Sequence, residues 1–219
     1  MTGSEFAEEM DETLWRILSV RDSALARLGE AVGRADMAQL LRGALRNEME
    51  AAEIAALWMP ATGDLEAKLA FARQSGDEAR HYGLIAERLA ALGVDLQGFA
   101  PLAGGPSRLF HYLQGLGTTV ERVAAAQFTR EAIGYRSNEL FISFCEACGD
   151  TGTAALYRER IQPDEKHHHE WGKRILGRLA SDPGEQAAAR SAILTTLELA
   201  EELRSLAAGR LLVEALPGC

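Results

Sequence analysis

Two copies of one short motif carry the residue types that bind metal ions. The first copy is Asp77-Glu78-Ala79-Arg80-His81 and the second is Asp164-Glu165-Lys166-His167-His168. Glu and His three residues apart share one face of a helix, so both side chains can reach the same ion. With 23 Glu and five His in 219 residues, chance gives about 0.02 such motifs with a preceding Asp. Two copies therefore predict a metal site.

One more acid per motif completes the predicted ligand set. Glu48 precedes the first motif and Glu131 precedes the second by similar distances. Each spacing lets the chain run up one helix and down the next to the same depth. Glu50 and Glu53 compete with the first acid, Glu139 competes with the second, and His169 competes with the last histidine. The six predicted ligands are Glu48, Glu78, His81, Glu131, Glu165 and His168.

The charges of this set indicate two divalent ions. Four carboxylates carry a charge of about −4, and burying them without cations would be very costly. A site rich in oxygen, with one imidazole per ion, suits iron or manganese, whereas a structural zinc site favours cysteine and histidine. We expect two iron ions, with manganese or a mixed manganese–iron pair as the alternative.

The elements that must position these residues are helices. Apolar residues recur at three- and four-residue spacings with no alternating strand pattern, which predicts an all-α fold in one domain over 1–219. Two hairpins, 36–92 and 118–180, flank a Gly- and Pro-rich connection at 94–107. This order is typical of a four-helix bundle with one long crossover, with the first and last helices packed outside it. The expected helices are 4–32, 36–59, 64–92, 108–148, 152–180 and 185–215.

Composition narrows the location and the partners. The net charge of −9 disfavours nucleic acid as a partner. No apolar run reaches the roughly 18 residues of a membrane helix, and the acidic start of the chain does not resemble a secretory signal.

Three cysteines make no disulfide framework, and we interpret Cys145 and Cys148 as a pair of semi-buried helix residues rather than a redox pair. We expect a cytoplasmic protein without a membrane partner.

The doubled motif with its preceding glutamates resembles the di-iron carboxylate oxygenase and oxidase branch of the ferritin-like superfamily. The resemblance covers about 36–180 and extends to the metal sites of phenylacetyl-CoA epoxidase components, multicomponent monooxygenases and tRNA hydroxylases. It implies that the six residues bind the metals and that Asp77 and Asp164 hydrogen-bond the ligating histidines. This chain departs from the multicomponent monooxygenases at Tyr135, where they place a threonine.

The resemblance also implies an activity, namely the oxidation of a small organic substrate with O2. The electrons would come from a partner such as a reductase or a ferredoxin. The chain could also form a homo-oligomer. Gln127 and Tyr135 lie four residues before and after Glu131, so they are candidates for a pocket wall near Ala44 and Ala52, or for a plain hydrogen bond to the site. The alternatives are a ferroxidase or rubrerythrin-like iron-handling protein, and a helical scaffold without metal.

Overall fold

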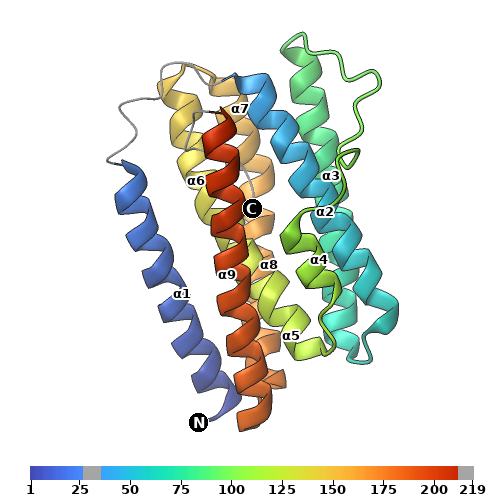
Figure 1. Ribbon diagram of the computed structural model, residues 1–219, viewed down its shortest axis with the longest axis vertical. Coiled ribbons are helices and arrows are strands. Elements are labelled where there is room, and N and C mark those ends of the chain that lie inside the picture. The colour runs from blue at the N-terminus through green and yellow to red at the C-terminus, as the bar shows by residue number, and fades with distance from the viewer. Residues whose placement is uncertain (27–35, 212–219) are drawn as a thin grey trace.

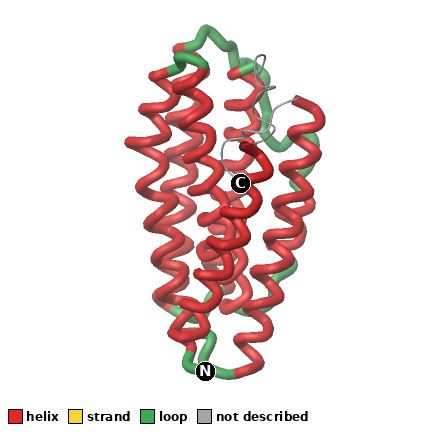
Figure 2. The backbone as a smooth tube through the Cα atoms, turned by 90° about the vertical axis from the view of Figure 1, so that its left-hand side faces the viewer, coloured by secondary structure: helices red, strands yellow, loops and turns green. Residues whose placement is uncertain are grey.

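The computed structural model describes residues 1–26 and 36–211 of the chain. It confirms the all-helical class, with 83% helix and no strand among these residues. The helices run along the long axis of the molecule and the loops gather mainly at its two ends (Figure 2). None of the described helices combines the length and the apolar character that crossing a lipid bilayer requires.

The first hairpin consists of α2 (Met37–Ala61) and α3 (Leu65–Ala91), which lie side by side in Figure 1. Asp36 starts α2 by accepting a hydrogen bond from the Ala38 amide, and Asp64 starts α3 by accepting one from the Ala67 amide. Side-chain oxygens at these positions satisfy amides that a helix start would otherwise leave unpaired. Pro60 lies in the last turn of α2, and the chain reverses directly after it.

The second hairpin is built from two long helical runs, each of which contains a π-helical turn. The first run is α5 (Thr119–Val123), η2 (Ala124–Arg130) and α6 (Glu131–Ala147). The second run is α7 (Thr151–Leu156), η3 (Tyr157–Ile161) and α8 (Gln162–Leu179). A π-turn bonds each amide to the carbonyl five residues earlier, so it shifts the faces of the helix that follows.

The prediction of one helix over 108–148 is wrong in its first part. A short helix, α4 (Arg108–Gln114), ends at Gly115, and a new helix begins after Thr118. The Thr118 side chain accepts from the Glu121 amide while the Glu121 carboxylate accepts from the Thr118 amide, a reciprocal cap that starts a helix. Of the outer predicted helices, 27–32 and 212–215 lie outside the described residues.

Helices α1 (Gly3–Ala26) and α9 (Pro183–Leu211) pack against the second hairpin. Helix α1 lies on α8, where a Cβ atom at Gly3 would come within 2.2 Å of the Gly177 carbonyl oxygen. Helix α9 lies on η2, α5 and α4. The segment between α3 and α4 is fixed by Glu50, whose carboxylate accepts from the amide and the hydroxyl of Ser107 at 2.9 and 2.6 Å.

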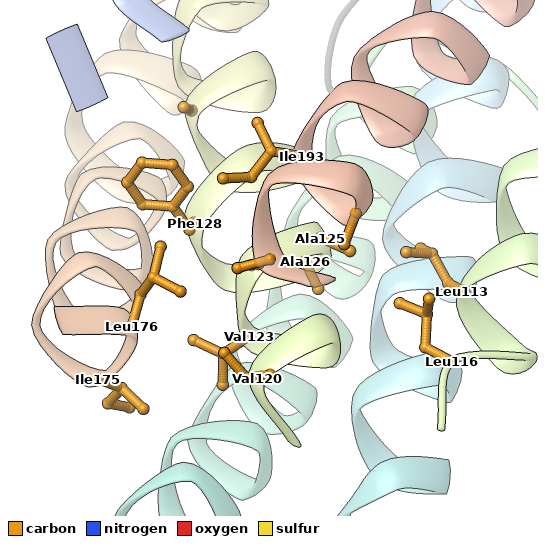
Figure 3. Packing of buried hydrophobic residues seen from close by; sticks show 14 of the residues in the cluster. Leu113, Leu116, Val120, Val123, Ala125, Ala126, Phe128, Ile175, Leu176 and Ile193 are labelled. Carbon is orange, nitrogen blue, oxygen red and sulfur yellow. The ribbon is translucent and has the colours of Figure 1, made fainter. Parts of the chain in front are cut away.

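The apolar core forms two clusters with a polar layer between them. The first cluster joins α1, α8, α9 and η2 to one end of α2 and α3, and Figure 3 shows Phe128, Leu176 and Ile193 meeting in it. The second cluster, around Phe141 and Tyr157, joins the other ends of the hairpin helices. Along each hairpin helix the predicted metal-binding residues fall between members of the two clusters. Burial of the two clusters therefore holds the polar layer in place from both sides.

Candidate metal centre

The polar layer brings all six predicted ligands together in the interior. Two overlapping groups of ligand atoms each lie within 4.8 Å of one another. The first group is Glu48, Glu78, His81 and Glu165, and the second is Glu78, Glu131 and His168. All six side chains are buried, and they come from α2, α3, α6 and α8. Because Glu78 belongs to both groups, it is the carboxylate best placed to contact two ions.

Each histidine turns its Nδ1 atom toward the carboxylates. His81 Nδ1 lies 3.2 Å from Glu78 Oε2 and 3.5 Å from Glu48 Oε2. His168 Nδ1 lies 3.1 Å from Glu131 Oε2 and 3.6 Å from Glu78 Oε1. A neutral imidazole binds a metal through a nitrogen that carries no proton. The Nδ1 atoms are therefore the ones that would face an ion.

The other ring nitrogen of each histidine meets the aspartate of the opposite motif. His81 Nε2 lies 3.2 Å from Asp164 Oδ2, and His168 Nε2 lies 3.1 Å from Asp77 Oδ2. A proton on Nε2 can thus be donated to a carboxylate, which leaves Nδ1 free for a metal. This outer hydrogen bond is the usual companion of a metal-binding histidine.

Two arginines of α3 hold these aspartates from outside. Arg73 Nε donates to Asp77 Oδ2 at 2.6 Å, and the Arg80 guanidinium donates to Asp164. Burial alone would raise the pKa of Asp77, but hydrogen bonds from His168 and Arg73 outweigh it and lower that pKa to about 2. The carboxylate is therefore ionised and remains an acceptor for the His168 ring.

Without cations, the carboxylates of the centre differ in their pKa values: those of Glu48 and Glu165 are raised, whereas contacts with His81 outweigh burial and lower the pKa of Glu78 to about 2. Burial and the neighbouring charge of Glu78 raise the pKa of Glu48 to about 8. Burial and the charges of Glu131, Glu78 and Glu48 raise the pKa of Glu165 well above its usual range. Crowded buried acids of this kind require positive charge nearby. Two divalent ions would meet that requirement, and the donors are the oxygen and imidazole groups that iron and manganese accept.

Sequence reasoning missed two residues at the centre. Gln74, fully buried one turn before Glu78, donates through Nε2 to Glu131 Oε1 at 2.5 Å. Tyr157 is fully buried, its hydroxyl has no hydrogen-bond partner among the described residues, and burial together with the charges of Glu48 and Glu165 raises its pKa. Gln74 lies four residues before Glu78, and this spacing could have predicted that it faces the centre. Tyr157 is the first residue of the π-turn η3, and this turn removed any such signal for the tyrosine.

A small cavity of about 10 Å³ lies among the carboxylates, enough for one water-sized guest. It is lined by Asn47, Glu48, Ala51, Glu78, Arg130, Glu131 and Glu165. The predicted pocket residues, Gln127 and Tyr135, do not line this cavity. Tyr135 packs edge-on against Trp15 of α1, and Gln127 sits in η2 where its backbone meets Gly172 of α8. For Gln127 the physical reason is the π-turn η2, which breaks the four-residue stacking between this residue and Glu131.

The competing side chains have other contacts. The ring nitrogens of His169 lie 2.7 Å from the Phe128 carbonyl oxygen and 2.9 Å from Asp11 Oδ1, so this ring fastens α8 to η2 and α1. Glu53 is exposed, and Glu139 pairs with Arg136 near the surface. Cys145 is buried, Cys148 is exposed, and both are free thiols.

Comparison of the chain with models of protein families, with curated proteins and with solved structures gave no match. The fold and the site thus define the class of the protein by themselves. It is an all-helical protein with a buried carboxylate–histidine cluster that could hold a metal ion.

Proposed function

We propose that this chain is a ferritin-like di-iron oxidoreductase that reacts with O2. The observation that supports this most is the reciprocal arrangement of the two motifs. Each histidine faces the carboxylates with Nδ1 and the aspartate of the other motif with Nε2. Glu48, His81 and Glu165 would hold one ion, Glu131 and His168 the other, and Glu78 would contact both.

Bound iron would supply the two electrons that O2 chemistry needs and a site where O2 can bind. The residues of the chain do the rest. The two apolar clusters exclude bulk water from the layer, and the aspartates fix the histidine tautomers. Gln74 holds one oxygen of Glu131 and so limits the positions that this carboxylate can take. The small cavity leaves room beside the carboxylates for one guest the size of water.

We propose a small organic molecule as the substrate, oxidised by two electrons in each turnover. The second candidate is a ferroxidase or rubrerythrin-like activity, and the size of the cavity favours it. A space of about 10 Å³ holds one guest the size of water and requires side chains to move before an organic molecule can enter.

Exposure to excess ferrous iron and air separates the two activities. An oxygenase retains its two irons and accumulates no ferric mineral, because it has no route for storing oxidised iron. Iron retained after gel filtration, measured per chain, is the readout. If many oxidised irons are held per chain in a soluble assembly, the substrate is ferrous iron and not an organic molecule.

A further inference from the structure

Four arginines follow the seam between α3 and α8, on the side of the metal centre where the histidines lie. Arg73 and Arg80 project from α3, and Arg174 and Arg178 project from α8. Each makes an ion pair with an acid on the same seam. We call these four residues the arginine seam.

The guanidinium groups form the outer layer of this surface. The Arg73 side chain is 54% exposed and its partner Asp77 is 12% exposed. The Arg80 side chain is 40% exposed and its partner Asp164 is 19% exposed. Arg174 and Arg178 are also more exposed than the acids they contact, Glu66 and Asp64. In each of these four ion pairs the guanidinium group is therefore the outer charge, although the whole chain carries a net charge of −9.

Two short chains of contacts join this surface to the metal centre. One runs from Arg73 through Asp77 to His168, with contacts of 2.6 and 3.1 Å. The other runs from Arg80 through Asp164 to His81, and its second contact is 3.2 Å. On this side, one aspartate links each buried histidine to an arginine whose side chain is exposed. Because electron transfer weakens steeply with distance, a donor docked here would lie close to the ions.

We propose that the arginine seam is the docking surface for an acidic one-electron carrier protein of the ferredoxin kind, an inference that rests on the proposed function. Two reduced carriers would each lose one electron and become oxidised. Their two electrons would return the pair of ions from ferric to ferrous. Electron-transfer complexes of this type are small and short-lived, and complementary charge guides their formation.

The net negative charge of the chain favours binding of an acidic carrier at the arginine seam over the rest of the surface. A carrier with negative charge is repelled by most of a surface whose net charge is −9 and attracted where guanidinium groups protrude. The four arginines share one seam, so they can act together on one face of a partner. Nucleic acid is the other polyanion that such a surface could attract, and the experiment below distinguishes it.

The test measures binding of a plant-type [2Fe–2S] ferredoxin to the iron-loaded protein by calorimetry at low and high salt. The double variant Arg174→Glu with Arg178→Glu leaves Asp77 and Asp164 untouched. The matched control, Arg108→Glu with Arg190→Glu, changes the net charge equally but reverses two exposed arginines that pair elsewhere, with Glu202 and Glu9. We expect the seam variant to lower affinity by at least about tenfold and the control to have little effect.

A second readout follows the rate at which ferric protein is reduced. The seam variant should slow reduction by reduced ferredoxin by a similar factor and leave reduction by dithionite unchanged. Equal losses in the seam variant and the control would overturn the proposal, as would tighter binding of a single-stranded RNA at the same arginines. If wild-type protein takes up no iron, the proposed function fails, whereas ferredoxin binding to the seam can still be measured by calorimetry.

Discussion

His81 of the first hairpin and Asp164 of the second lie in contact, with 3.2 Å between Nε2 and Oδ2. The relationship is repeated in reverse by His168 and Asp77 at 3.1 Å. Each hairpin therefore supplies the outer partner for the histidine of the other. Neither motif has its complete set of contacts until α3 and α8 have packed together, so folding and assembly of the centre are coupled.

Replacing either aspartate by alanine should weaken metal binding by roughly 10–100-fold, because the histidine of the other hairpin loses the group that fixes its tautomer. Affinity is measured by competition with a calibrated chelator for Asp77→Ala and Asp164→Ala. Asp95→Ala, in the exposed connection after α3, is the control. Wild-type affinity in both variants would show that the two aspartates act only in surface ion pairs.

His81 and His168 should be needed for metal binding, whereas His167 should not. His81→Ala and His168→Ala should each lose metal and keep their helices, because the two apolar clusters do not depend on the ions. His167 is exposed, so His167→Ala should retain metal. Metal per chain and far-ultraviolet circular dichroism give the two readouts. Full metal content in the His81 and His168 variants would refute this choice of ligands.

The residues of the metal centre differ in how far sequence could identify them. Glu78 and His81 share a face of one regular helix, so local spacing alone predicts that they meet. Glu48 needed a correct register between two helices, which the short turn at 62–64 provides. Tyr157 could not be found in this way, because it is the first residue of the π-turn η3, which comes before α8.

The helical class was predictable from periodicity, but the interruption before Thr118 was not located. Apolar residues continue at helical spacing on both sides of Gly115 and Gly117, and the reciprocal cap of Thr118 and Glu121 decides where the new helix starts. The sequence also did not predict that the arginines of α3 and α8 point outward. Their outward position depends on pairing with acids that lie up to 114 residues away in the chain.

Gly172 should tolerate no side chain, because α8 and η2 approach most closely there. A Cβ atom would lie 2.6 Å from the Gln127 carbonyl carbon and 2.7 Å from the Phe128 nitrogen. Gly172→Ala should therefore lower the free energy of unfolding by about 1–3 kcal/mol. At exposed Gly76 of α3 the same change meets nothing within 4 Å and should raise stability by about 0.5–1 kcal/mol. Urea denaturation of both variants measures these free energies of unfolding. Equal stabilities of the two variants would contradict the close packing at Gly172.

The two central cysteines should differ in reactivity. Burial, together with the charge of Asp150, raises the pKa of the Cys145 thiol to about 12, so the reactive thiolate is scarce at pH 8. Cys148 is exposed. Cys219 lies outside the described residues, so labelling with a thiol reagent is best done in a Cys219→Ser background. We expect rapid labelling of Cys148 alone, with Cys145 reacting after denaturation. Rapid loss of both thiols, with formation of a disulfide, would indicate a redox pair instead.

Anaerobic titration of metal-free protein with ferrous iron tests the central claim most directly. The six buried ligands predict two ions per chain, read by elemental analysis after removal of unbound metal. The same titration of the double variant His81→Ala with His168→Ala should give close to none. Two ions per chain in the wild type and their loss in the variant would agree with the account. A wild-type chain that takes up no ferrous iron, or holds only one zinc ion that iron does not replace, would contradict it.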